Sequence, residues 1–290
     1  MHNPPYRDWK CCLTGGNTSA FDIALHMFAE RRDYILAEEY TYLTAVETGH
    51  PLGLKFQGIK MDEEGLIPEH IDQILTDWDE SAKEARKPYL LYTVSTGQNP
   101  TGATPSLERK REIYRVAQKH DLYILEDDPY HYLQMLPDTE TALDLKNTTI
   151  TIEEVKKNLI PSYLHIDTDG RVFRMDSFSK IICPGSRMGW VTASEQMVQR
   201  LVRTHETSLQ NPSGFSQIML FKLLSENFGQ VGLLNWTFYL QQEYTQRRNN
   251  LVAAFDRYVP KGIVSLEPPK AGLFVSAMLE SVTCFTTLLT

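Results

Sequence analysis

Short apolar runs alternate with segments of helical spacing over the first half of the chain, and this alternation narrows the choice of fold more than any other feature. The runs at 34–42, 88–95 and 122–130 are typical of buried strands, and each ends in polar residues or in a turn rich in Gly, Asn and Pro. A helix is expected between the last two, from about Ser106 to His120. Strands that alternate with helices form a mostly parallel sheet with helices on its faces. We therefore expect an α/β fold.

The rest of the chain is less regular. Further strands are expected at 171–177 and 188–193, and the stretch between residues 136 and 169 is a polar surface excursion with a short helix start at 148–155. Helices then dominate, at about 195–205, 213–227 and 231–258, the last one stopped by Pro260. Two strands at 261–266 and 271–276 would open a smaller α+β domain.

One loop carries a lysine between hydroxyl groups and an arginine. Ser177-Phe178-Ser179-Lys180 follows the strand at 171–177, and Arg187 comes seven residues after the lysine. A lysine amine forms an imine with a carbonyl only when it is neutral, which burial or a neighbouring cation favours. Arginine presents a planar set of donors that suits phosphate. A surface Lys and Arg in a Ser-rich loop is the alternative, and this motif alone does not exclude it.

Two other segments offer an anion site and an aromatic ring. Gly15-Gly16-Asn17-Thr18-Ser19-Ala20 precedes apolar residues at helical spacing, so it resembles a helix N-terminus whose free N–H groups favour a phosphate. Many helices begin in this way with nothing bound. Tyr42 follows a strand and is suited to stack on a flat ring, although a tyrosine packed at a strand end fits the segment equally well.

Polar residues end two more strands. Asn99 lies in the turn Thr96-Gly97-Gln98-Asn99-Pro100-Thr101-Gly102, where its amide is able to donate to a phenolic oxygen or a carboxylate. The run at 122–130 ends in Glu126-Asp127-Asp128-Pro129-Tyr130. A carboxylate there suits a protonated ring nitrogen. Solvated acids are a second interpretation, and a metal site is the weakest one because no His/Asp cluster at ligand spacing accompanies them.

Together these motifs resemble the fold-type I pyridoxal phosphate (PLP) aminotransferases. The likeness is greatest to fungal aromatic amino acid aminotransferases and to kynurenine/2-aminoadipate aminotransferases, and it runs in order from about Thr14 to about Leu279. Four segments carry it: Gly15-Gly16-Asn17-Thr18-Ser19-Ala20, Asn99-Pro100-Thr101-Gly102, Glu126-Asp127-Asp128-Pro129-Tyr130 and Ser177-Phe178-Ser179-Lys180. The combination is far more specific than any one of them.

The resemblance implies a role for each candidate residue. Lys180 would form the internal aldimine with PLP and shuttle a proton, and Asp127 would pair with the pyridinium nitrogen. Asn99 and Tyr130 would bind the phenolic oxygen, Asn99 would also contact substrate, and Tyr42 would stack on the ring. The phosphate would be held by Gly16, Asn17, Thr18, Ser177, Ser179 and Arg187. Lys180, Asp127 and Tyr130 would be the catalytic residues, with no metal.

The sequence departs from the family at three places. Relatives often have Ser and Gln where this chain has Asn17 and Thr18. They also carry an N-terminal segment over the active site and a C-terminal arginine that clamps the substrate carboxylate, and neither can be assigned here. The tail at 280–290 contains no arginine. We therefore expect a chain truncated at both ends, with a remnant segment at 1–13, a PLP-binding large domain at 14–240, and an interdomain helix and incomplete small domain at 241–290.

Composition agrees with a soluble enzyme. The chain has 290 residues, of which 42% are hydrophobic, enough for a large core. A net charge of −8 argues against nucleic acid as a partner, and the four cysteines do not form a disulfide framework. With no signal-like or membrane-spanning apolar stretch, we expect a cytoplasmic protein. The resemblance implies a homodimer that acts on amino acid and 2-oxo acid substrates.

Three hypotheses about function follow. The leading one is transamination between an aromatic amino acid, kynurenine or 2-aminoadipate and a 2-oxo acid. The second keeps the fold and the lysine but assigns another PLP reaction, such as β-elimination or decarboxylation, and product analysis separates it from the first. The third is a catalytically impaired fragment that binds PLP or a full-length partner, and measurable transamination by the purified chain would count against it.

Overall fold

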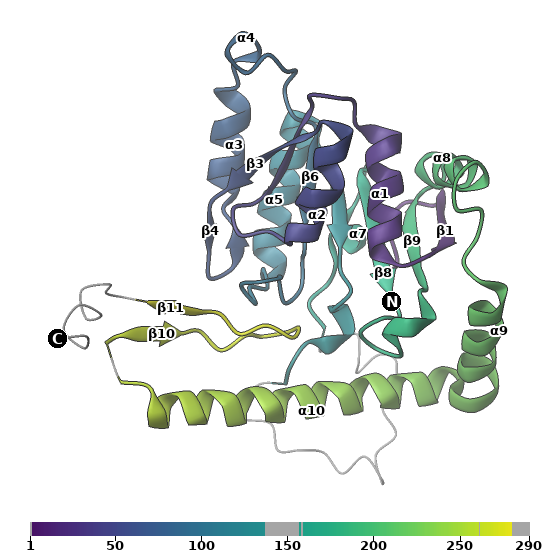
Figure 1. Cartoon of the computed structure of the whole chain (residues 1–290), viewed down its shortest axis with the longest axis vertical. Helices are drawn as coiled ribbons and strands as arrows, with labels where there is room; N and C mark the ends of the chain where they lie inside the picture. The colour runs from purple at the N-terminus through teal and green to yellow at the C-terminus, as the bar shows by residue number, and fades with distance from the viewer. Residues whose placement is uncertain (1, 137–156, 158, 261, 280–290) are drawn as a thin grey trace.

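A seven-stranded sheet forms the centre of the molecule (Figure 1). The computed structural model describes residues 2–136, 157, 159–260 and 262–279. In sheet order the strands are β1 (Trp9–Thr14), β9 (Gly189–Ser194), β8 (Val172–Ser177), β7 (Tyr123–Asp127), β6 (Leu90–Thr93), β2 (Tyr34–Glu38) and β3 (Lys55–Ile59). The pairs from β8 to β3 are all parallel, whereas β9 is antiparallel to both of its neighbours. The predicted α/β fold with a mostly parallel sheet is confirmed.

Helices cover both faces of this sheet. The helices of the described residues are α1 (Asn17–Phe28), α2 (Leu43–Gly49), α3 (Pro68–Thr76), α4 (Glu80–Lys83), α5 (Leu107–His120), α7 (Tyr163–Ile166), α8 (Glu195–Glu206), α9 (Gly214–Lys222) and α10 (Gly229–Tyr258). Short 3-10 turns occur at His50–Leu52, His131–Leu133 and Pro184–Ser186, and a π-helical turn occurs at Leu223–Phe228. Two small antiparallel hairpins lie outside the main sheet. One pairs β4 (Met61–Asp62) with β5 (Gly65–Leu66), and the other pairs β10 (Val264–Leu266) with β11 (Ala277–Leu279).

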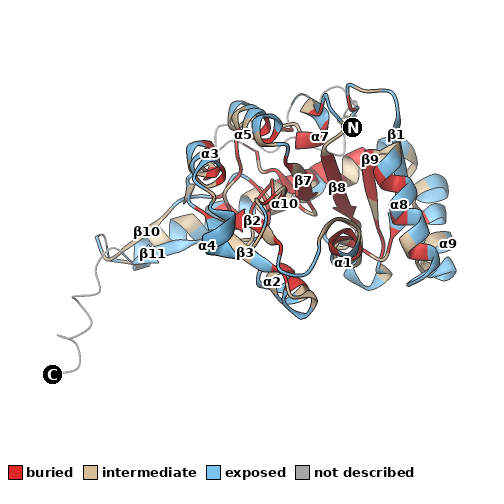
Figure 2. Cartoon of the chain, turned by 90° about the horizontal axis from the view of Figure 1, so that it is seen from above, coloured by how far each residue is buried: buried red, intermediate tan, exposed pale blue. Residues whose placement is uncertain are grey.

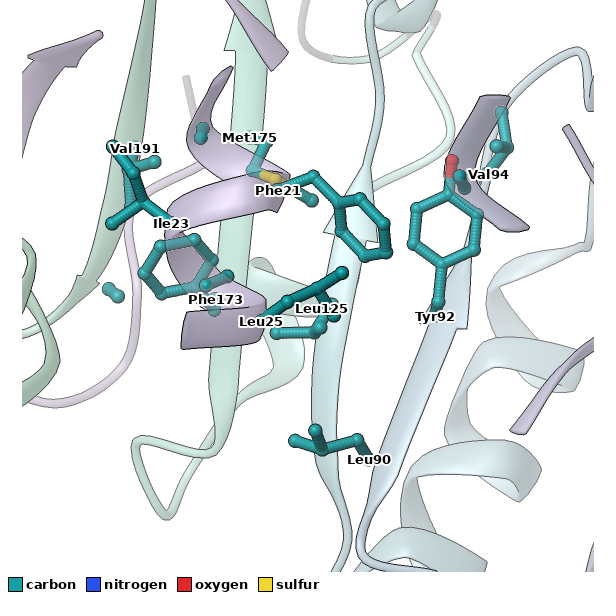
Figure 3. Packing of buried hydrophobic residues seen from close by; sticks show 14 of the residues in the cluster. Phe21, Ile23, Leu25, Leu90, Tyr92, Val94, Leu125, Phe173, Met175 and Val191 are labelled. Atoms are coloured by element: carbon teal, nitrogen blue, oxygen red, sulfur yellow. The ribbon is translucent and has the colours of Figure 1, made fainter. Parts of the chain in front are cut away.

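The apolar core is divided by the sheet into two clusters. The first packs α1, α2 and α8 on one face, and the second packs α3, α5 and α7 on the other. Figure 2 shows the central strands buried between helices whose outer surfaces are exposed. In the first cluster Phe21 of α1 meets the ring of Tyr92 on β6, with ring centroids 4.7 Å apart (Figure 3). This contact fixes the start of α1 against the middle of the sheet.

Helix α10 lies along one side of the molecule, between α9 at one end and the β10–β11 hairpin at the other (Figure 1). Its inward residues Leu234 and Phe238 form a third apolar cluster with Leu136 and Leu159. The helix therefore joins the central sheet to the C-terminal hairpin.

The observed elements differ from the sequence prediction in two places. Trp9–Thr14 pairs with β9 along its whole length and forms the edge strand of the sheet, although residues 1–13 were expected to be a remnant segment and no strand was predicted there. The strand predicted at 271–276 is wrong, because the partner of β10 is Ala277–Leu279 and Phe274 instead packs against Tyr130. The helix start predicted at 148–155 and the tail at 280–290 lie outside the described residues. The division into domains stays a prediction.

Candidate active site

The predicted site residues follow the carboxyl ends of four neighbouring strands. Because β2, β6, β7 and β8 are parallel, these ends lie along one edge of the sheet. Tyr42 follows β2, Asn99 follows β6, Asp127 ends β7 and Ser177 ends β8. Ligands of open parallel sheets bind at this edge. Segments that lie far apart in the sequence are thus brought to one place.

The N-terminus of α1 and Arg187 form a cradle for an anion. Gly16 has a φ of +100°, which favours glycine, and a Cβ there would lie 3.1 Å from Nη2 of Arg187. The guanidinium donates to the carbonyl oxygen of Gly15 and to Oγ of Ser179, both at 3.4 Å. Oγ of Ser177 in turn accepts from the backbone N–H of Ser179 at 3.0 Å. These groups converge on the first turn of a twelve-residue helix, where unpaired N–H groups attract phosphate.

Arg187 has no acidic partner in the described ranges of the chain. Its side chain is exposed, and the groups it donates to are a hydroxyl and backbone carbonyls. Thr18, at the second position of α1, is also exposed. The positive charge is therefore free to bind a doubly negative ligand.

Asp127 is a buried carboxyl held by neutral groups. Its Oδ1 accepts from Nδ2 of Asn17 at 2.6 Å, and its Oδ2 accepts from the hydroxyl of Tyr92 at 2.8 Å. Burial raises the pKa of Asp127, and the two hydrogen bonds act in the opposite direction. The side chain of Asn17 thus points to Asp127. In the described residues Asp127 has no ion-pair partner of its own, so a cationic N–H donor would find a matched acceptor here.

The two acids beside Asp127 face the other way. Arg174 is fully buried, and its Nη1 lies 3.0 Å from Glu126 and 3.0 Å from Asp128. Its Nε and Nη2 make a bidentate pair with Asp176. In the part of the chain that the structure describes, no group of three or more His, Cys, Asp or Glu side chains is arranged to hold a metal ion. The two outer carboxylates of the acidic run therefore share one arginine of the neighbouring strand.

Aromatic and amide groups close the site on the side away from α1. Burial raises the pKa of the Tyr130 hydroxyl, next to Asp127, and a hydrogen bond with Asn99 partly offsets this. The ring of Tyr130 meets that of Phe274 edge-on at 5.8 Å. Tyr42 is half-buried at the start of α2 and packs on the first core cluster. Asn99 and Tyr130 are thus in contact, as their shared predicted role requires.

Lys180 lies in a tight turn after β8. The backbone N–H groups of Ile182 and Cys183 both donate to the carbonyl oxygen of Phe178, at 2.8 and 3.1 Å. Ile181 is buried, whereas Lys180 is exposed and has no hydrogen-bond or ion-pair partner among the described residues. The turn therefore anchors the backbone and leaves the amine available for a ligand.

Comparison with known proteins identifies the family. The profile described as "Aminotransferase class I and II" matches residues 7–286, which is nearly the whole chain. The chain belongs to the class I and II aminotransferases. The cofactor of this family is pyridoxal 5'-phosphate.

Individual relatives of this aminotransferase chain come mostly from fungi. An aromatic amino acid aminotransferase of Schizosaccharomyces pombe is 48% identical over 275 residues, which are 95% of this chain and 58% of the relative. The L-tyrosine:2-oxoglutarate aminotransferase of Serpula lacrymans is 41% identical over 278 residues, 95% of this chain and 52% of the relative. The crystal structure of aminotransferase Aro8 from Candida albicans superposes with a TM-score of 0.90 at 40% identity, covering 99% of this chain and 60% of that one. The chain thus spans little more than half the length of these relatives.

Tyr92 is a residue of the candidate site that sequence reasoning missed. It was assigned only to a buried strand, yet its hydroxyl is one of the two donors to Asp127. A signal was present, because a tyrosine inside an apolar strand needs a partner for its hydroxyl when it is buried. The sequence does not say that this partner would be Asp127 on the neighbouring strand.

Proposed function

We propose that this chain binds PLP through Lys180 and catalyses transfer of an amino group between an aromatic amino acid and a 2-oxo acid. Kynurenine and 2-aminoadipate are further candidate donors. The observation that carries the proposal is the arrangement of three ionisable groups at one edge of the sheet, none of which has a partner of opposite charge among the described residues. These are the buried carboxyl of Asp127, the guanidinium of Arg187 and the amine of Lys180.

The residues present fit the cofactor. Two buried polar atoms at the start of α1, Oδ1 of Asn17 and Oγ of Ser19, have no hydrogen-bond partner in the described structure. Oγ of Ser19 lies 3.4 Å from the position that a Cβ on Gly15 would take, which puts it beside the glycine turn. Buried polar atoms without partners are rare in folded proteins and call for a ligand or water. A phosphate at this helix end, with Arg187 beside it, would accept from the hydroxyl of Ser19, whereas Oδ1 of Asn17 is itself an acceptor and needs a donor such as water.

PLP, when bound, supplies a ring that accepts the electron pair released at the substrate α-carbon. Asp127 would accept a hydrogen bond from the protonated ring nitrogen and stabilise the positive charge there. Asn99 and Tyr130 would hold the phenolic oxygen, and Tyr42 would cover one ring face. Nζ of Lys180 would take the proton from the substrate α-carbon and deliver it to the cofactor, and it would move a proton in the opposite direction in the second half of the reaction.

The choice of substrates rests on the relatives. Proteins named for aromatic amino acids, and one named for tyrosine and 2-oxoglutarate, match nearly all of this chain. An amino acid donor and a 2-oxo acid acceptor are the corresponding partners here. A cytoplasmic location stays a prediction from the sequence. Within the described ranges, none of the helices combines the length and the apolar character that crossing a bilayer requires.

A homodimer is proposed from the surface of α9. Phe215, Met219 and Phe221 are 84%, 72% and 66% exposed, and Val231 at the start of α10 is 52% exposed. Figure 2 shows α9 at the edge of the molecule with most of its surface exposed. Apolar surface of this kind marks interaction sites. Sedimentation equilibrium of the purified chain tests this, since a monomer at micromolar concentration would contradict it.

The visible absorption spectrum of the chain with PLP tests the proposed function. We expect a band that requires Lys180, that is absent in Lys180→Ala, and that is replaced by the spectrum of the amine form of the cofactor when tyrosine or phenylalanine is added. Formation of a new amino acid from 2-oxoglutarate separates transamination from β-elimination and decarboxylation. A band that never responds to amino acids would instead support a PLP-binding fragment without turnover, and the absence of any band would contradict PLP binding.

A further inference from the structure

A tryptophan of α10 donates a hydrogen bond to the backbone next to Lys180. Nε1 of Trp236 donates to the carbonyl oxygen of Ile181 at 2.6 Å, and Ile181 directly follows Lys180. We propose that Trp236 is a positioning residue for Lys180, which couples the position of α10 to the placement of the amine. The inference rests on the proposed function, since it assigns Trp236 a role through Lys180.

The turn that holds Lys180 has few other connections. In the described part of the chain, the other hydrogen bonds made by residues 178–183 stay within residues 177–188. They close the turn on itself and join it to the start of β9. The buried side chain of Ile181 adds apolar contacts with the first core cluster. The bond from Trp236 is thus what ties the turn to a helix more than fifty residues away in the sequence.

The indole is held in place by its own neighbours. Its ring stacks on Phe228 with centroids 6.1 Å apart and planes 22° apart, and it lies 5.6 Å from the ring of Tyr239. Phe228 ends the π-helical turn that precedes α10, and π-turns in helices frequently occur at functional sites. The indole N–H is therefore aimed at the Ile181 carbonyl by packing, and the hydrogen bond needs little further ordering.

Helix α10 is anchored to the core on the C-terminal side of this contact. Leu240 and Tyr244 pack on the first core cluster, and Oγ1 of Thr245 accepts from the backbone N–H of Leu136 at 2.9 Å. Beyond residue 258 the chain continues into the β10–β11 hairpin. A shift of α10 would therefore move the Ile181 carbonyl, and displacements of about 1 Å at a reacting group are enough to change a rate by about 100-fold.

Trp236→Phe tests the proposal, because it removes the N–H donor and keeps an aromatic ring between Phe228 and Tyr239. Trp78→Phe is the matched control, since Nε1 of Trp78 also donates to a backbone carbonyl, that of Ala85, at 3.2 Å and away from the site. In the chain without PLP, we expect hydrogen exchange of the peptide covering 178–187 to rise roughly three- to tenfold in Trp236→Phe, as expected for loss of one hydrogen bond. The same peptide should not change in Trp78→Phe.

A second readout uses the chain with PLP. If Trp236 positions the amine, Trp236→Phe lowers kcat and leaves KM for the amino acid unchanged, whereas Trp78→Phe changes neither. Unaltered exchange at 178–187 in Trp236→Phe would overturn the proposal, and so would an equal rise in both variants. The exchange experiment needs no cofactor. If PLP fails to bind the wild-type chain while exchange at 178–187 responds to Trp236→Phe alone, the proposed function is wrong and the coupling of α10 to the turn stands.

Discussion

Glu126, Asp127 and Asp128 follow one another at the end of β7, and their side chains lie on opposite faces of the chain there. The groups that contact the carboxylates differ between the two faces. Glu126 and Asp128 share the buried Arg174, which also holds Asp176. Asp127, between them, accepts only from Asn17 and Tyr92. Successive side chains of a strand point to opposite faces. Three adjacent acids are therefore divided between a structural ion cluster and a ligand site.

This difference indicates what each carboxylate is for. Glu126 and Asp128 each already have the guanidinium of Arg174 at 3.0 Å, so each has a cation at ion-pair distance within the protein. Burial raises the pKa of Asp127, and among the described residues its carboxylate accepts from neutral donors and has no cation paired with it. A positive charge is what this carboxylate lacks. The ring nitrogen of PLP would supply that charge. The comparison is open to four mutational tests, ordered here from the largest expected change in free energy to the smallest.

Arg174→Met would disrupt the ion cluster that Arg174 forms with the acids on one face of β7. It leaves Glu126, Asp128 and Asp176 buried without their shared cation, and removing one partner of a buried ion pair costs about 3–5 kcal/mol. We expect urea unfolding to show a loss of that size. Arg187→Met is the control from the proposed phosphate site, because it removes an exposed arginine that has no acidic partner among the described residues. Equal unfolding free energies of the two variants would contradict a structural role for Arg174 that Arg187 does not share.

Glu38 at the end of β2 is a third case, a buried acid with neither an arginine nor a proposed ligand. It accepts from Oγ1 of Thr93 and from the N–H of Val94, and burial raises its pKa from 4.5 to about 7. A raised pKa of an acid means that the ionised form is disfavoured in the folded chain, so stability falls as the pH rises from 4.5 through about 7. At about 1.4 kcal/mol for each pKa unit, the loss is at most roughly 3 kcal/mol.

Glu38→Gln checks this dependence. Chemical unfolding at pH 4.5, 5.5, 6.5 and 7.5 should show a difference between variant and wild type that shifts in favour of the variant as the pH rises. A difference that stays constant over this range would contradict the raised pKa.

Arg187→Met would weaken the proposed phosphate site. Loss of one charge-assisted contact should weaken PLP binding roughly 10- to 100-fold. The unfolding free energy of the chain without PLP should change by less than about 0.5 kcal/mol, as is usual at exposed positions. Fluorescence titration with PLP measures the first quantity and urea unfolding the second. Unaltered PLP affinity would remove Arg187 from the phosphate site.

Tyr92→Phe is expected to have the smallest effect. It removes one of the two donors to Asp127 and should lower the unfolding free energy by about 1 kcal/mol. Tyr163→Phe is its matched control on the other face of the sheet, because the fully buried hydroxyl of Tyr163 has no partner in the described structure. That variant should lose no stability. A larger loss for Tyr163→Phe than for Tyr92→Phe would contradict the assigned hydrogen bond.

The sequence predicted most of the central strands but not the strand at the edge of the sheet. Apolar runs that end in polar turns located β2, β6, β7 and β8, and the parallel order of these strands then required Asn99, Asp127 and Lys180 to lie near one edge. The residues at Trp9–Thr14 gave no strand signal of this kind, because five of the six are not buried and the segment forms a sheet edge. The register of β1 is set by its pairing with β9, which begins 175 residues after β1 ends. The local sequence of β1 does not encode that pairing.

The ligand site shows the same limit. Nothing in Glu126-Asp127-Asp128 by itself says which acid faces a ligand, and the resemblance alone selected Asp127. The selection follows physically from Arg174, which stands on the opposite face and was not singled out from the sequence. Tyr92 and Trp236 were missed for a similar reason, since each acts through a partner on another element. Long-range hydrogen bonds of this kind depend on tertiary packing.

The most direct test of the account compares Asp127→Asn with Asp128→Asn, measuring PLP affinity and unfolding free energy for both. Asp127→Asn should keep the stability within about 1 kcal/mol, because the amide retains contacts with Asn17 and Tyr92, and should weaken PLP binding by about 100-fold or more. Asp128→Asn should lose about 2 kcal/mol or more through its broken pair with Arg174 and bind PLP as the wild type does. If both variants lost stability equally and bound PLP equally, the division of these acids between structure and ligand would be wrong.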